Sequence, residues 1–138
     1  MSQLANLPAL QAAAAYIALL TIALVPLTFA VIRLRVVTGT GIGDGGHARL
    51  AKAIRVHANY TENIPFGLAL LLLLALTGSP VWTVHILGLG LIIGRTAHAT
   101  GLSQSSGPSP ARGLGIMLTQ FSLLFGAGMI LWQTLARP

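Results

Sequence analysis

The chain has 138 residues, of which 54% are hydrophobic and 7% are charged, and its mean hydropathy is +0.81. A soluble domain carries about 25% charged residues, so this composition predicts an integral membrane protein with one all-α domain over residues 1–138. The absence of cysteine excludes disulfides, thiolate metal sites and a cysteine nucleophile, and no metal site is predicted. The net charge of +6 could suggest a nucleic-acid partner, but the basic residues lie in short segments beside apolar tracts, so no nucleic acid is expected.

Four apolar tracts follow one another along the chain, and each is close to the roughly 20 residues that a helix needs to cross a bilayer. They cover residues 7–32, 57–77, 81–102 and 114–132. The first basic residue, Arg33, follows the first tract, which is therefore predicted to be a retained span and not a cleaved signal peptide. The chain is predicted to form a four-helix bundle that crosses the membrane several times.

The basic residues predict the orientation of this bundle. Seven of the eight Lys and Arg residues lie on the side of the first and third loops: Arg33, Arg35, Arg49, Lys52, Arg55, Arg95 and Arg112. Arg137 alone lies on the other side. The positive-inside rule therefore places the two long loops in the cytoplasm and both termini outside, and Trp82 and Trp132 would both lie at the outer interface.

The second tract opens with a polar run that begins at Arg55. On a helix with 100° per residue, Arg55, Asn59 and Glu62 share one face. A charged side chain within a spanning helix costs at least roughly 2.5 kcal/mol, so this face should turn toward a bundle interior or a wet cavity. We therefore predict a site for a polar, anionic ligand here, whereas Arg49 and Lys52, like Arg33 and Arg35, are more simply interpreted as contacts to anionic lipid.

The third tract carries a second polar row near its cytoplasmic end. Arg95 and His98 are three residues apart and occupy one stripe of a helix, at the same depth as the row in the second tract. The two rows can face each other, although His98 could instead simply bond a neighbouring carbonyl. His57 is expected in helix packing or at the headgroups, and His85 at the outer interface.

Small residues predict close helix packing. Gly90 and Gly94 form a GxxxG pair, and the fourth tract carries Gly126 and Gly128, which suits packing within the bundle or between subunits. One subunit of four helices has little interior to shelter two polar rows, so we expect an oligomer with sites at subunit boundaries.

These features resemble the MAPEG family, the membrane-associated proteins in eicosanoid and glutathione metabolism. The resemblance lies in the Arg-x-His-x-Asn-x-x-Glu-x-x-Pro run over residues 55–65, the row of Arg95 and His98, and a Pro-x-Arg that ends at Arg112. The Gly-Asp-Gly-Gly turn at residues 43–46 is similar to the small bacterial branch of the family.

The resemblance implies a homotrimer in a bacterial inner membrane that binds glutathione between subunits near the cytoplasmic face. The residues that it implies for holding glutathione are Arg55, Asn59 and Glu62, with Arg33 or Arg35 reaching in from the adjacent subunit. Arg95 and His98, in the facing row, are predicted to contribute to the same binding site. Arg112 matches the family residue assigned to the thiol, where a guanidinium would favour the thiolate. The implied function is a glutathione transferase or peroxidase, with a lipophilic electrophile or hydroperoxide as the second substrate.

One departure from the family pattern leaves an alternative open. Leu102 stands where eukaryotic catalytic members have a tyrosine that would hydrogen-bond glutathione. A non-enzymatic membrane scaffold that binds glutathione or a lipophile is therefore the second hypothesis, although the matching glutathione contacts favour an enzyme. A transporter or channel is less well supported, because the outer halves of the tracts are almost purely apolar.

Overall fold

The computed structural model describes residues 7–104 and 107–136, so Arg137, which entered the charge count above, lies outside the described residues. Four α-helices make up the fold: α1 (Leu7–Thr38), α2 (Ala48–Leu76), α3 (Val81–Gln104) and α4 (Pro110–Ala136). No strand occurs within these described ranges. The prediction of an all-α fold with four helices is confirmed.

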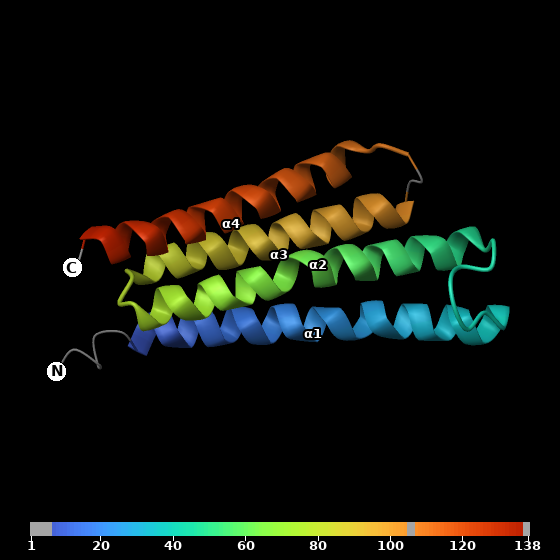
Figure 1. Ribbon diagram of the computed structural model, residues 1–138, viewed down its shortest axis with the longest axis horizontal. Helices are drawn as coiled ribbons and strands as arrows, with labels where there is room; N and C mark the ends of the chain where they lie inside the picture. The colour runs from blue at the N-terminus through green and yellow to red at the C-terminus, as the bar shows by residue number, and fades with distance from the viewer. Residues whose placement is uncertain (1–6, 105–106, 137–138) are drawn as a thin grey trace.

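Three of the helices, α1, α2 and α4, are long and apolar enough to cross a membrane. The third helix, α3, is not among them because polar residues such as His85, Arg95 and His98 interrupt its apolar sequence. It nevertheless lies beside the other three along much of their length (Figure 1). The role of α3 as a fourth span therefore stays a prediction.

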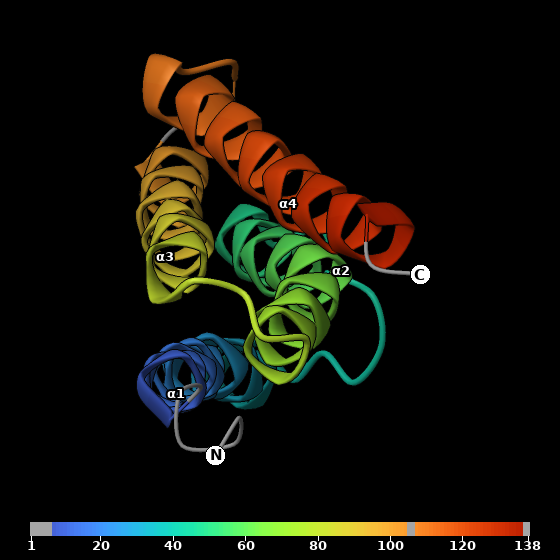
Figure 2. The ribbon, with the colours of Figure 1, turned by 90° about the vertical axis from the view of Figure 1, so that its left-hand side faces the viewer.

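The two ends of the bundle differ in their connections. Both described chain ends and the short α2–α3 turn lie at one end, while the α1–α2 and α3–α4 connections lie at the other (Figure 1). Viewed along the bundle, α2 lies between α1 and α4, and α3 flanks it (Figure 2). The most extensive packing joins α3 with α4 and α1 with α2. We call the end with the two long connections the loop end.

The core contains aliphatic side chains from the first three helices, with Leu71, Leu87 and Leu91 fully buried. Outside the core, many large apolar side chains are exposed, including Phe29 at 64% and Leu124 at 68%. In water such surfaces would associate, whereas a bilayer solvates them. The outer surface therefore suits contact with lipid or with other subunits.

The α2–α3 turn follows from its sequence. Gly78 has φ of 77°, and the backbone N–H of Ser79 donates to the carbonyl of Leu74 at 3.1 Å. This is the arrangement of a Schellman motif, in which a glycine adopts the left-handed conformation just beyond the helix. The motif ends α2 and allows α3 to return along it.

The two histidines outside the polar rows bond to α1. Nε2 of His57 lies 3.2 Å from Oγ1 of Thr28, which confirms the helix-packing interpretation. Nδ1 of His85 lies 3.0 Å from the hydroxyl of Tyr16, so its partner comes from another helix and not from α3 itself. Both side chains therefore connect α1 to the remaining helices.

The GxxxG glycines of α3 serve packing within the subunit. A Cβ atom at Gly94 would lie 2.7 Å from Oγ1 of Thr119, and one at Gly90 would meet the hydroxyl of Ser122. Because both neighbours belong to α4, glycine at these positions lets α3 and α4 approach closely.

Candidate functional site

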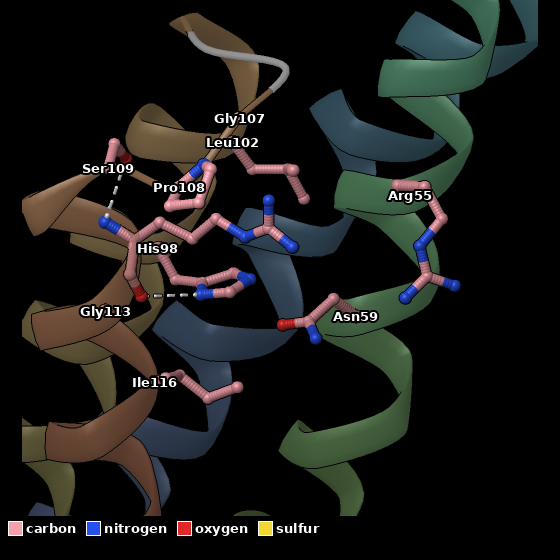
Figure 3. Close-up of a pocket in the computed structure, with 10 residues that line it drawn as sticks. Arg55, Asn59, His98, Leu102, Gly107, Pro108, Ser109, Gly113 and Ile116 are labelled. Carbon is pink, nitrogen blue, oxygen red and sulfur yellow. Dashed lines mark hydrogen bonds between the residues drawn. The ribbon is translucent and has the colours of Figure 1, made fainter.

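A pocket opens at the loop end, between α2 and the corner formed by α3 and α4. Its volume is about 530 Å³, within the range of about 300–1,000 Å³ that is common for small-molecule sites. Its lining residues are Arg55, Asn59, His98, Leu102, Gly107, Pro108, Ser109, Arg112, Gly113 and Ile116. The two polar rows predicted from the sequence thus contribute to one cavity (Figure 3).

The start of α2 supplies one wall of the pocket. Asn59 points from α2 toward His98, while Arg55, one turn earlier, lies farther from His98 (Figure 3). Nη1 of Arg55 lies 4.0 Å from Oε1 of Glu62, and the two side chains are 61% and 56% exposed. Glu62 does not line the cavity but lies beside it, on the same face of α2 as Arg55, as the spacing predicted.

Arg95 lies behind this wall and holds Asn59 in place. It is 3% exposed, and its Nη1 donates to Oδ1 of Asn59 at 2.6 Å and to the backbone carbonyl of Asn59 at 3.3 Å. Its Nε donates to Oγ1 of Thr119 at 2.9 Å. Arg95 therefore joins α2, α3 and α4 from within the bundle, and it does not line the pocket.

The buried guanidinium of Arg95 has no carboxylate partner among the described residues. Both acids of the chain interact elsewhere, Asp44 with the backbone N–H of Gly46 and Glu62 with Arg55. Nη2 of Arg95 is buried without a hydrogen-bond partner. A cation held this way gives the adjacent pocket a positive field that favours an anionic ligand.

The opposite wall comes from His98 and the first turn of α4. Nδ1 of His98 lies 3.1 Å from the backbone carbonyl of Arg112. Because a carbonyl can only accept, Nδ1 carries the proton in this contact and Nε2 of the neutral ring is an acceptor. The expected carbonyl contact of His98 is thus present, and the same ring also lines the pocket.

Arg112 is positioned by the capping of α4. Ser109 precedes the helix, Pro110 is its first residue, and the backbone N–H of Arg112 donates to Oγ of Ser109 at 3.3 Å. Serine is favourable at the N-cap because its hydroxyl oxygen accepts from a backbone N–H of the first turn. Proline is favourable at the first helical position because it lacks an N–H that would otherwise be unsatisfied. The Pro-x-Arg motif thus places Arg112 in the first turn of α4, at the edge of the cavity.

Leu102 lines the same pocket and is 8% exposed. The position that holds a tyrosine in the catalytic members named above is therefore part of the pocket lining. It contributes an apolar surface in place of a hydroxyl.

Arg33 and Arg35 lie outside the pocket of this single chain. Nη1 of Arg35 lies within hydrogen-bond distance of the carbonyls of Thr40, Gly41 and Gly43, at 3.2, 2.9 and 3.1 Å. Arg35 thus organises the α1–α2 connection, whereas Arg33 is exposed on α1. Of the two, Arg33 therefore remains the better candidate for the contact predicted from an adjacent subunit.

Sequence reasoning missed two polar residues of this region. Thr119 is fully buried and bonds Arg95, and Ser109 caps α4 beside Arg112. A hydroxyl inside the apolar fourth tract and a serine just before Pro110 were the available signals. Neither predicts a partner, because the partners lie on another helix or in the first turn of α4.

Comparisons with known proteins agree with this architecture. A model of the MAPEG family matches residues 13–132. The chain is 40% identical over 88 residues to Inner membrane protein YecN of Escherichia coli strain K12, over 64% of this chain and 67% of that protein. Inner membrane protein YecN of Escherichia coli O6:H1 strain CFT073 matches to the same extent, and no solved structure matches significantly. Because the family match covers most of the sequence, the chain belongs to the MAPEG family.

Proposed function

We propose that the protein is a membrane-bound, glutathione-dependent transferase or peroxidase that acts on a lipophilic electrophile or hydroperoxide. One observation carries this proposal. Side chains from three helices line one cavity at the loop end: Arg55, Asn59, His98 and Arg112. We further propose that the chain acts as a homotrimer in a bacterial inner membrane, the location stated in the name of its relative from Escherichia coli.

The polar groups of the pocket suit the charges of glutathione, which carries two carboxylates and one ammonium. The guanidinium fork of Arg55 matches a carboxylate, and the neighbouring Glu62 carboxylate matches the ammonium. Oδ1 of Asn59 is already an acceptor for Arg95, so the amide NH₂ of Asn59 remains to donate to a glutathione carbonyl or carboxylate.

The chemistry would take place on the other wall. The guanidinium of Arg112 would stabilise the glutathione thiolate, and Nε2 of His98 is left to accept the proton that the thiol releases. In conjugation, the thiolate sulfur forms a bond to an electrophilic carbon and displaces the leaving group. In peroxide reduction, it attacks a peroxide oxygen and releases the alcohol, and a second glutathione then converts the sulfenic acid to the disulfide with loss of water.

A measurement of both activities tests this proposal. The purified protein should conjugate glutathione to chlorodinitrobenzene or reduce cumene hydroperoxide, and Arg112→Ala should lower kcat by roughly 10²-fold or more with a smaller change in glutathione affinity. Arg112→Lys should restore part of the rate because it keeps the positive charge without the planar fork. Equal rates for the native protein and Arg112→Ala would show that Arg112 takes no part in the reaction.

The second candidate function is a non-enzymatic scaffold that binds glutathione or a lipophile, and Leu102 favours it. The pocket has an apolar surface at the position where catalytic relatives would have a phenol. If the native protein binds glutathione by calorimetry but shows neither activity, the enzyme proposal fails and the scaffold replaces it. If Leu102→Tyr then gains conjugation activity, the missing phenol accounts for the difference.

A further inference from the structure

A second cavity lies at the loop end, between α1, α2 and the end of α3. Its volume is about 340 Å³, and its lining residues are Leu27, Ala30, Arg49, Lys52, Ala53, Val56 and Ser103. None of these residues lines the pocket assigned to glutathione. The second cavity is therefore a separate feature of the surface.

Two cations line this second cavity without a partner from the chain. Arg49 and Lys52 are three residues apart on α2 and so lie on the same face. Within residues 7–104 and 107–136 neither side chain makes a hydrogen bond or an ion pair. Asp44 and Glu62, the two acids of the chain, interact elsewhere. The cavity can therefore receive an anion without breaking an existing ion pair.

The remainder of the second cavity is mainly apolar. Leu27 and Ala30 come from α1, and Ala53 and Val56 come from α2. The hydroxyl of Ser103 donates to the carbonyl of Ala99 at 2.7 Å, so its hydrogen is already used within α3. Positive charge at one side and aliphatic surface at the other match an amphiphile better than a free anion.

The depth of the second cavity agrees with this chemistry. Ala30 lies near the end of the first apolar tract, residues 7–32, and Val56 lies just before the second, residues 57–77. In a bilayer, the cavity would then lie where hydrocarbon gives way to headgroups. Basic pockets between spanning helices at such a level bind anionic lipid headgroups.

We propose that the second cavity is a binding site for an anionic phospholipid, with the phosphate on Arg49 and Lys52 and an acyl chain along Leu27 and Ala30. Arg49 suits the phosphate because its guanidinium can donate two parallel hydrogen bonds, and Lys52 adds a second charge. The site is independent of glutathione binding, since the two cavities share no residue.

Native mass spectrometry of the full-length protein tests this site, with phosphatidylglycerol and phosphatidylcholine of identical acyl chains as probes. We expect preferential retention of phosphatidylglycerol, weakened about fivefold by Arg49→Ala and by about an order of magnitude or more when Lys52→Ala is added. Arg33→Ala is the charge-matched control, because Arg33 is exposed at the same end of α1 but lies outside the cavity. An equal loss with Arg33→Ala would overturn the proposal in favour of a general surface potential.

A second variant separates a phospholipid from a bare phosphate ion. Ala30→Phe fills the apolar part of the cavity and leaves both cations in place. Retention of phosphatidylglycerol should fall, whereas inorganic phosphate should compete with the remaining lipid as well as it does in the native protein. Unchanged lipid retention in Ala30→Phe would show that only the anion is bound and would overturn the phospholipid assignment. Glutathione affinity of Arg49→Ala and Ala30→Phe, measured by calorimetry, should equal that of the native protein, because neither residue lines the other pocket. Loss of the lipid site and loss of the proposed function are therefore distinguishable.

Discussion

At the scale of single residues, Arg95 holds the wall of the pocket in place. Its guanidinium bonds Asn59 on α2 and Thr119 on α4 while it is almost fully buried. A buried charge is costly when its hydrogen bonds are not made, so the bonds of Nε and Nη1 favour the arrangement in which these helices are in register, while Nη2 stays without a partner. Arg95 is thus a positioning residue for Asn59, although it lies in the same polar row as His98, which lines the pocket.

Replacement of Arg95 should therefore weaken both the fold and the site. Arg95→Ala leaves a cavity and removes three hydrogen bonds, so we expect the free energy of unfolding to fall by about 2–4 kcal/mol and glutathione affinity to fall as well. Thr119→Val removes only one of these bonds but leaves Nε of the buried Arg95 without its acceptor, so it should cost about 1–3 kcal/mol. Thermal unfolding in detergent and glutathione calorimetry measure the two effects. An Arg95→Ala protein as stable as the native one would contradict this role.

Replacement of Glu62, unlike that of Arg95, should weaken glutathione binding with almost no effect on stability. Its contact with Arg55 is exposed, so Glu62→Gln should change the free energy of unfolding by less than about 0.5 kcal/mol. Glutathione affinity should nevertheless fall about tenfold, because the charge-assisted hydrogen bond to the ammonium is lost. Asp44→Asn is the matched control, since Asp44 lies in the α1–α2 connection outside the pocket. If calorimetry gives the same affinity for Glu62→Gln and the native protein, Glu62 is not part of the site.

At the scale of elements, the close contact of α3 with α4 gives the pocket its shape. A Cβ atom at Gly115 would meet the backbone of His98 and would lie 2.7 Å from the carbonyl oxygen of Gly94. A Cβ atom at Gly101 would lie 2.6 Å from the backbone nitrogen of Arg112. Glycine on both helices therefore permits the His98 ring to reach the Arg112 carbonyl.

A single added methyl group should disturb this contact. Gly115→Ala should destabilise the protein by about 1–3 kcal/mol, because backbone atoms on both helices would have to move apart. The movement should also reduce glutathione-dependent activity. Gly128→Ala is the control on the same helix, since a Cβ atom there would have no atom from another helix within 4 Å. Thermal unfolding of both variants is the measurement, and equal stability would show that α3 and α4 tolerate a wider spacing.

At the scale of the whole molecule, polar chemistry gathers at one end and apolar surface covers the rest. Both cavities described above lie at the loop end, where the two long connections also lie (Figure 1). The outer surface of α1 and α4 exposes large apolar side chains such as Phe29 and Leu124. This distribution suits a protein that binds a polar ligand at one membrane face and meets apolar molecules from the bilayer.

The predicted orientation can be tested cleanly because the chain contains no cysteine. Ile42→Cys places a thiol in the α1–α2 connection, where Ile42 is 95% exposed, and Pro80→Cys places one in the α2–α3 turn. In intact cells, a membrane-impermeant maleimide should label the Pro80→Cys protein and spare the Ile42→Cys protein, because positively charged loops stay in the cytoplasm. If only the Ile42→Cys protein is labelled, the orientation is the reverse of the predicted one, and the candidate site lies on the outer side of the membrane.

Much of the candidate site could be predicted from helical spacing. Residues three or four apart share a helix face, so the rows of Arg55 with Asn59 and of Arg95 with His98 were predictable. Spacing says nothing about distances between helices, however, and it therefore did not separate the buried Arg95 from the pocket-lining His98. It likewise left open which of Arg33 and Arg35 is free, which depends on the carbonyls that the α1–α2 connection presents to Arg35.

The amino-acid sequence by itself determined the four helices, the membrane character and the family, because hydropathy and local motifs are properties of contiguous residues. Tertiary structure alone decided that Asn59, His98 and Arg112 surround one cavity with Arg95 behind them, and that Arg49 and Lys52 line another. Those groupings depend on how closely α3 approaches α4 and α1 approaches α2. That approach depends on packing between residues far apart in the chain, which no local pattern encodes.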